Sequence, residues 1–153
     1  MPRFLPLALD MRDKRCVIVG GGAVGTRKAH TLVRSGADVT VISPSLTPSL
    51  AELAEAGQIR WQEGTYRDEY VRTAFLVIAA TSDETLNATI VRLATQNGAL
   101  ACDASSADRS GVIFGALLEE DDATIAVFTD GRAPAHARRT RDQIAHLLRR
   151  PRE

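Results

Sequence analysis

The sequence predicts an α/β fold: a Rossmann-like, doubly wound parallel sheet followed by a small annex made of a β-hairpin and a helix. Two observations lead to this prediction. Short β-branched runs alternate with amphipathic segments between residues 15 and 103, and a glycine-rich turn stands directly after the first run. Such alternation, with short connections, is typical of right-handed βαβ units and of a sheet that helices cover on both faces.

Five runs of four to six residues have the character of strands, because they are rich in β-branched residues and are bounded by turn residues. They span residues 15–19, 38–42, 59–62, 74–79 and 99–102. The usual crossover connections of a doubly wound fold predict the strand order 3-2-1-4-5 for these runs.

Helices are predicted between these runs, at residues 24–35, 47–56 and 83–96. Each is followed by a glycine, the residue that most often stands just beyond a helix. Pro48 suits the first turn of the second helix. Thr81 and Glu84 have the spacing of a capping box before the third. A short helical turn at 68–72 is expected between the third and fourth strands.

The alternation stops after Ser105, where the annex begins. Two further strands are expected at 112–118 and 124–129, around an acidic turn at 119–122, and a helix at 134–148 precedes an arginine-rich tail. We therefore divide the chain into a dinucleotide-binding domain, residues 1–110, and a dimerisation annex, residues 111–153. Two strands and one helix cannot bury a core alone, so the annex must pack on the first domain or on a partner subunit.

Composition excludes several classes of protein. The chain has 153 residues, 19 basic and 19 acidic, so no overall field favours nucleic acid or a membrane surface. The longest apolar run, residues 74–80, is far shorter than the roughly 20 residues of a spanning helix. The first ten residues lack the features of a signal peptide, so a cytoplasmic location is expected. Cys16 and Cys102 would lie two strand spacings apart, about 9–10 Å, and should stay reduced. No metal site is expected.

The strongest chemical signal is the glycine pattern within VIVGGGAVGTRK, residues 17–28. It follows a strand and opens a helix, as in dinucleotide-binding folds. Its first glycine allows a tight turn, its second lets a pyrophosphate approach the helix N-terminus, and its third lets helix and strand pack closely. The alternative is a glycine turn without a ligand. The expected cofactor contacts here are Gly20, Gly22, Ala23, Val24 and Gly25.

The ends of the second and fourth strands would complete a cofactor site. Ser43 and Pro44 end the second strand without a carboxylate for a ribose or an adjacent arginine for a 2′-phosphate, which favours NAD. The alternative role for Ser43 is helix-start chemistry. After the fourth strand, Thr81, Asp83 and Asn87 are expected near the cofactor. The alternative is that Thr81 or Asp83 caps the helix and that Asn87 is solvated.

Four segments, taken together, resemble the precorrin-2 dehydrogenase / sirohydrochlorin ferrochelatase family, the N-terminal module of siroheme synthase. They are LPLALDMRDKRCVIVGGGAVGTRKAHTLVRSGADVTVISP, AATSDETLNATI, ALACDASSADRSGVIFGALL and TIAVFTDGRAPAHARRTRDQI. The likeness runs in one order from residue 4 to about residue 148. It implies NAD-dependent oxidation of precorrin-2, a tetrapyrrole, to sirohydrochlorin, in some members followed by iron insertion, and it implies a homodimer.

The resemblance also points to catalytic residues. The family's catalytic aspartate at the end of the fifth strand aligns with Ser105, and Asp103 stands two residues earlier on the same side of the strand. We therefore expect Asp103 and Ser105 at the catalytic site. The alternative is that Asp103 only caps or accepts backbone hydrogen bonds. Because serine occupies the aligned position and the family's usual C-terminal helical extension does not follow, weak or absent iron insertion is expected.

The annex supplies candidate substrate contacts. The family's Ser/Thr-Gly-Gly turn corresponds to a turn that holds Thr129 and Gly131, and Arg138 follows at the start of the last helix. Arginine binds carboxylates bidentately, as a polycarboxylate tetrapyrrole would require. The alternative is a solvated helix face, which is the better interpretation for Arg149, Arg150 and Arg152. A non-catalytic dinucleotide-sensing module stays open as the alternative function.

Overall fold

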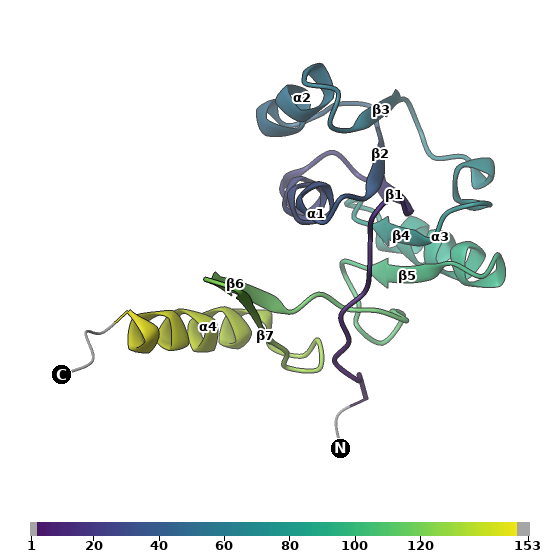
Figure 1. Ribbon diagram of the computed structural model, residues 1–153. Coiled ribbons are helices and arrows are strands. Elements are labelled where there is room, and N and C mark those ends of the chain that lie inside the picture. The colour runs from purple at the N-terminus through teal and green to yellow at the C-terminus, as the bar shows by residue number, and fades with distance from the viewer. Residues whose placement is uncertain (1–2, 150–153) are drawn as a thin grey trace. The chain divides into compact units, whose positions relative to one another are not determined.

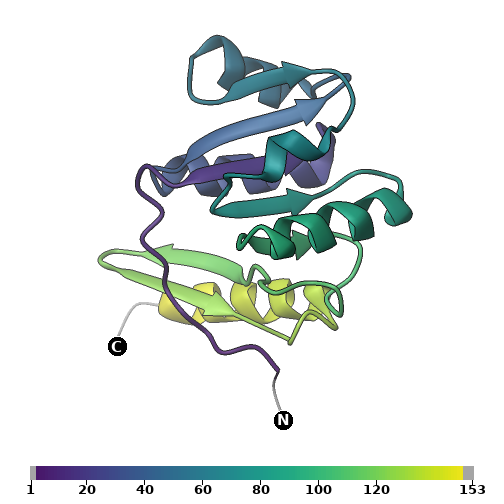
Figure 2. The same cartoon turned by 90° about the vertical axis from the view of Figure 1, so that its right-hand side faces the viewer.

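Residues 3–149 are described by the computed structural model, and within them the first unit, Ala8–Val112, holds a five-stranded parallel sheet. Its strand order is β3-β2-β1-β4-β5, as predicted. The strands run in the same direction, as Figure 2 shows. Their bounds are β1 Arg15–Val19, β2 Asp38–Ser43, β3 Arg60–Glu63, β4 Leu76–Ala79 and β5 Leu100–Asp103.

The helices of this unit lie on opposite faces of the sheet (Figure 1). Helix α1 (Ala23–Arg34) contacts β1, β2 and helix α2 (Pro48–Glu55) on one face. Helix α3 (Glu84–Gln96) contacts β4, β5 and the short 3₁₀ helix η1 (Asp68–Val71) on the other. The predicted helices therefore occur within one residue or so of their expected bounds, because their apolar periodicity and terminal glycines agree.

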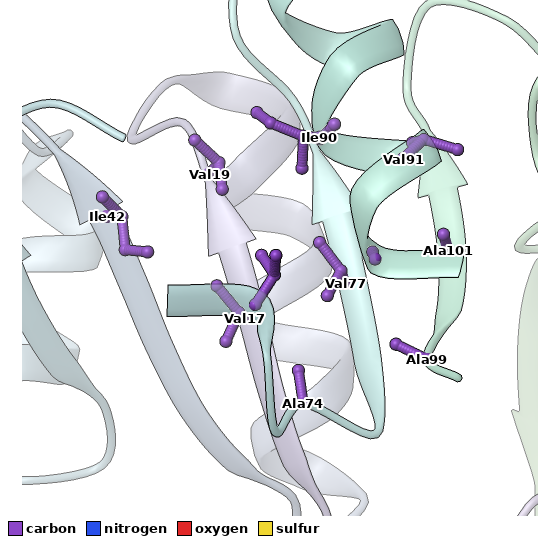
Figure 3. Packing of buried hydrophobic residues seen from close by; sticks show 12 residues of the cluster. Val17, Val19, Ile42, Ala74, Val77, Ile90, Val91, Ala99 and Ala101 are labelled. Atoms are coloured by element: carbon purple, nitrogen blue, oxygen red, sulfur yellow. The ribbon is translucent and has the colours of Figure 1, made fainter. Parts of the chain in front are cut away.

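The core beneath α3 is built from small and β-branched side chains (Figure 3). Val17, Val77 and Ala101 come from adjacent strands at matching register and point to the same face of the sheet. Ile90 and Val91 of α3 cover them, and both are nearly or fully buried. Because these strands are parallel and paired in register, the carboxyl ends of β1, β4 and β5 lie at one edge of the sheet.

The expectation that helices cover both faces fails at β3. The connection from β3 to β4 carries η1 instead of a full helix, so every residue of β3 is exposed. A groove of about 460 Å³ lies on this part of the sheet. Its lining residues include Arg15, Thr40, Arg60 and Tyr70. The segment 64–75 is too short to hold both a long helix and the turns on either side of it.

The second unit consists of residues 113–149 together with residues 3–7. Strands β6 (Ala116–Glu120) and β7 (Ala123–Val127) form an antiparallel hairpin, and helix α4 (Pro134–Leu148) contacts both (Figure 2). The predicted strand at 112–118 is displaced, since strand pairing begins at Ala116. Asp121 takes a left-handed φ of 47°, which shortens the turn and lengthens β6 beyond the expected bound.

The boundary between the units differs from the expected division at residue 110. It follows Val112, and the first residues of the chain group with the second unit. The reason is chemical: the Asp130 carboxylate accepts hydrogen bonds from the amides of Arg3 (2.9 Å) and Phe4 (3.0 Å). These bonds lower the pKa of Asp130 below its ordinary value, that from Phe4 most.

Two further expectations concern the described residues. Cys16 and Cys102 are both buried and both free, as predicted. Among residues 3–149, no helix is long and apolar enough to cross a bilayer.

Candidate functional site

The loop between β1 and α1 requires glycine at two of the predicted positions. Gly20 has a φ of +125°, and a Cβ there would lie 2.3 Å from the Ala80 carbonyl oxygen. A Cβ on Gly25 would lie 2.1 Å from the carbonyl oxygen of Gly20. The first contact brings the loop against the end of β4, and the second brings α1 against the loop. Both glycines therefore have the steric roles expected of them.

Gly22 differs from its neighbours because open space lies above it. It is the N-cap of α1, has an ordinary φ of −87° and makes no side-chain cap. A Cβ placed on it would meet no atom within 4 Å. The first amides of α1, including those of Ala23 and Val24, have no partner within the helix, so they form an anion-binding end. This open cradle fits the pyrophosphate of a dinucleotide.

Gly21 is a third position at which the loop requires glycine, and the sequence analysis did not single it out. A Cβ there would lie 2.1 Å from the Ser45 carbonyl oxygen and 2.7 Å from the Ser43 hydroxyl oxygen. The glycine pattern specifies only its first, third and sixth positions, so the run of three glycines was the available signal.

Ser43 lies beside this loop, but its side chain is engaged. The residue is buried, and its hydroxyl donates to the Ser45 carbonyl at 2.6 Å. That bond shapes the turn after β2 at Pro44. The hydroxyl is thus held within the turn. The alternative of helix-start chemistry does not apply to Ser43, because Thr47 is the N-cap of α2. The described turn carries neither a carboxylate nor an arginine at residues 43–46.

The segment after β4 is held by Asn87. This side chain is fully buried, so the alternative of a solvated asparagine is wrong. Its Oδ1 accepts from the amide (3.1 Å) and the hydroxyl (2.7 Å) of Thr81. Its Nδ2 donates to the Thr81 carbonyl at 3.1 Å and to the Ser105 hydroxyl at 3.4 Å. Asn87 thus joins the ends of β4 and β5.

The cap of α3 is Asp83, not Thr81. The Asp83 Oδ1 accepts from the amides of Thr85 (2.9 Å) and Leu86 (3.0 Å). The predicted capping box starting at Thr81 is wrong, because that hydroxyl is bound to Asn87 instead. The Asp83 carboxylate is therefore engaged in capping the N-terminus of α3.

Asp103 ends β5 with a completely buried side chain. Its Oδ2 accepts from Arg109 Nε at 2.6 Å, and its Oδ1 accepts from the amide (2.8 Å) and hydroxyl (2.6 Å) of Ser105. The Ser110 hydroxyl fixes the backbone by accepting from the Asp103 amide at 2.9 Å. Burial raises the pKa of Asp103, but the bonds from Arg109 and Ser105 outweigh it and leave that pKa below its ordinary value.

Arg109 is a second residue that the sequence analysis missed. Its side chain is 38% exposed, and its Nη2 also donates to the Ser105 hydroxyl at 3.2 Å. The hydrogen bond to Asp103 raises the pKa of Arg109. The available signal was an arginine six residues after a strand-ending aspartate, in a segment otherwise made of small and acidic residues.

The predicted substrate contacts of the annex lie in the second unit. The Thr129 hydroxyl accepts from the Ala133 amide at 3.3 Å, and Gly131 has a φ of +74°. Together they shape the turn that leads into α4. Arg138 is exposed near the start of this helix. All three residues belong to the second unit, while the glycine loop and Asp103 belong to the first.

The basic residues further along the annex have local partners. Arg141 pairs with Asp142 at 2.7 Å and donates to the Leu117 carbonyl at 3.4 Å. Arg149 lies 3.6 Å from Glu120, and its side chain is 72% exposed, which agrees with the prediction of a solvated position. Arg150 and Arg152 lie outside the described residues. In the described part of the chain, no group of His, Cys, Asp and Glu side chains could hold a metal ion.

Comparisons with known proteins give consistent results. Residues 7–116 match the model of a family described as putative NAD(P)-binding. The chain is 31% identical over 145 residues to precorrin-2 dehydrogenase of Bacillus subtilis, covering 95% of this chain and 89% of that protein. It is 35% identical over 145 residues to siroheme synthase 1 of Serratia proteamaculans, of which it spans only 30%.

Among solved structures, the chain resembles SirC, a precorrin-2 dehydrogenase, with a TM-score of 0.82. The match covers 94% of this chain and 71% of that one at 24% identity, so it supports the fold.

Proposed function

Because the chain belongs to the precorrin-2 dehydrogenase family, we propose that it oxidises precorrin-2 to sirohydrochlorin with NAD as the hydride acceptor. The observation that carries this proposal is the open cradle at Gly22, at the same edge of the sheet as the ends of β4 and β5. In open α/β sheets, ligands bind in the crevice outside the carboxyl ends of the strands.

The glycine loop would bind the cofactor by its backbone. The amides of Ala23 and Val24 and the positive end of the α1 dipole face the open space above Gly22 and would hold the pyrophosphate. When bound, the dinucleotide supplies a nicotinamide that accepts a hydride from the macrocycle, and a proton leaves the substrate as well. Gly20 and Gly25 hold the loop close enough to the sheet for this approach.

The ends of β4 and β5 would form the wall of the site. Asn87 fixes Thr81 to Ser105, so the two segments keep a constant spacing beside the cofactor loop. Such preorganisation lowers the entropic cost of aligning two reactants. The Ser105 hydroxyl donates to Asp103 and accepts from Asn87 and Arg109, so it orients these groups and does not itself bind the substrate.

NAD is the preferred cofactor in this proposal. The turn at residues 43–46 offers no guanidinium for a 2′-phosphate. Titration of the protein with NAD and with NADP would test this point, and tighter NADP binding would contradict it.

Thr129, Gly131 and Arg138 are proposed as further substrate contacts. Arg138 is exposed and has no ion-pair partner among residues 3–149, so its guanidinium is open to a carboxylate. We expect weak or absent iron insertion, since both carboxylate oxygens of Asp103 are already engaged and serine stands at the aligned position.

A homodimer and a cytoplasmic location complete the proposal. The second unit offers apolar surface for a dimer, because Leu5 (77%) and Leu147 (61%) are largely exposed. An isolated two-stranded hairpin is marginally stable, so a partner's surface would complete its core.

An anaerobic assay tests the activity directly. Precorrin-2 and NAD are mixed with the protein, and the appearance of NADH absorbance is followed. NADH formation that depends on both substrates is expected. Tight NAD binding without NADH formation would favour a dinucleotide-sensing module instead.

A further inference from the structure

The strongest unassigned feature is the ion pair between Asp103 and Arg109. The Asp103 side chain is fully buried, whereas the Arg109 side chain reaches solvent. The buried carboxylate can therefore hold the guanidinium in a fixed position at the surface. A carboxylate buried at the end of a strand is costly unless it is paired. Here it receives three hydrogen bonds, so its position is fixed by Arg109 and Ser105 together.

Only part of the Arg109 guanidinium is used by these bonds. Its Nε donates to Asp103 and one Nη2 hydrogen points to Ser105, while its Nη1 hydrogens make no hydrogen bond among residues 3–149 and Glu84 interacts with the guanidinium only electrostatically. The planar guanidinium is therefore held along one edge and leaves other N–H groups for a ligand. Arginine held in this way is suited to bind a carboxylate, because its fork matches the two oxygens.

A series of hydrogen bonds links the Asp103–Arg109 pair to the end of β4, beside the expected cofactor site. Arg109 binds Ser105, Ser105 binds Asn87, and Asn87 binds Thr81 directly after β4. The carbonyl of Ala80, the neighbour of Thr81, lies against the Gly20 position of the cofactor loop. One chain of contacts thus connects the guanidinium to the expected cofactor site.

We propose that Arg109 binds a carboxylate of the tetrapyrrole substrate and that Asp103 is the residue that positions it, not the base of the reaction. This assignment rests on the proposed function, because precorrin-2 is a polycarboxylate. Asp103 is a poor proton acceptor in this arrangement, since both of its oxygens already accept hydrogen bonds from cationic or hydroxyl donors. Removing the carboxylate would release the guanidinium and disturb substrate binding before it affected proton transfer.

The experiment compares Arg109→Gln, Arg109→Lys, Asp103→Asn and the double variant Arg109→Gln/Asp103→Asn. Arg92→Gln is the matched control, because Arg92 is an exposed arginine of α3. Three quantities are measured for each protein: the affinity for sirohydrochlorin by fluorescence titration, the affinity for NAD by calorimetry, and the steady-state parameters for precorrin-2. Thermal midpoints report whether each variant folds.

Arg109→Gln should weaken sirohydrochlorin binding and raise KM by about 10- to 100-fold, the range for one hydrogen-bonded charge pair. NAD affinity should not change. Asp103→Asn should shift the same quantities in the same direction by a smaller factor. The double variant should be no weaker than Arg109→Gln, because the two residues act as one unit. A methyl-esterified sirohydrochlorin should bind wild type and Arg109→Gln equally.

Two outcomes would overturn the assignment. One is a turnover rate that falls by a factor of about 100 or more in Asp103→Asn while KM and sirohydrochlorin affinity stay unchanged, which is the behaviour of a general base. The other is unchanged sirohydrochlorin affinity in Arg109→Gln, or a loss of NAD affinity in its place. Failure of wild type to form NADH would contradict the proposed dehydrogenase, while the titrations would still report on Arg109. If Asp103→Asn does not fold, the sirohydrochlorin and NAD affinities of Arg109→Gln test the assignment by themselves.

Discussion

Substitutions at two glycines of the same loop should separate folding from cofactor binding. At Gly20 the φ of +125° is strained for any other residue, and an added Cβ would lie 2.3 Å from the Ala80 carbonyl oxygen. Backbone strain costs about 1–3 kcal/mol and overpacking a similar amount, so Gly20→Ala should lower the free energy of unfolding by about 3 kcal/mol. For a domain of this size that corresponds to roughly 6–12 °C in Tm.

Gly22→Val should behave in the opposite way. The φ of −87° is ordinary and no atom lies within 4 Å of an added Cβ, so the main cost is a poorer N-cap, about 1 kcal/mol, and Tm should fall by only about 2–4 °C. The valine side chain would nevertheless fill the space above the first amides of α1. NAD affinity should therefore fall at least about tenfold, or 1.4 kcal/mol.

The assay combines thermal unfolding followed by circular dichroism with calorimetric titration of NAD. Thr95→Val is the control, because Thr95 is exposed near the end of α3, away from the loop. Undiminished NAD affinity in Gly22→Val would show that the cofactor does not bind at this loop. A wild-type Tm in Gly20→Ala would show that the loop relaxes around the new side chain.

Three further outcomes are expected. Asn87→Ala should lower the free energy of unfolding by about 2–3 kcal/mol in urea titration, since the substitution leaves buried polar groups of Thr81 unpaired. The control Thr95→Ala, at an exposed position of the same helix, should change the free energy of unfolding by less than about 0.5 kcal/mol. The pKa of Asp103 is lowered in the folded state, so the contribution of this carboxylate to stability is complete above its unfolded pKa of about 4 and is lost as pH falls through the folded value. The free energy of unfolding of Asp103→Asn should therefore vary less with pH below about 4 than that of wild type. Identical pH dependence in the two proteins would contradict this. A homodimer with residues 112–118 at its interface is expected. Light scattering at micromolar concentration should give the mass of two chains, and the mass of one chain would refute the dimer.

Much of the first unit follows from the sequence because its signals are local. β1 has its predicted bounds, and the glycines of the following turn are fixed by contacts with the adjacent strand. The helix α3 starts within one residue of its predicted bound, but the capping box was assigned to Thr81, because Thr81 and Asp83 are both competent caps and only the position of Asn87 decides between them. The short helical turn predicted at 68–72 is confirmed as η1, but the exposure of β3 that follows from so short a connection was not drawn from the sequence.

The chemical environment of the site was less accessible from the sequence. Asp103 and Ser105 were found from their place at a strand end, but their bonding depends on how the bend after β5 returns Arg109 to the strand. No periodicity encodes that return. For the same reason the sequence could assign the Ser43 hydroxyl to a ribose or to a helix start, whereas the path of the turn directs it to the Ser45 carbonyl.

The hydrogen bonds from Arg3 and Phe4 to Asp130 have a consequence for the order in which the chain folds. They join residues 127 and 126 positions apart, so the second unit is discontinuous in sequence and the whole first unit is inserted within it. During synthesis the first residues leave the ribosome without their acceptor and must wait until the turn at Asp130 emerges. Closing so long a loop is entropically costly in an unfolded chain. Prior folding of the first unit shortens the effective loop, so the N-terminal segment should be the last part of the described chain to dock.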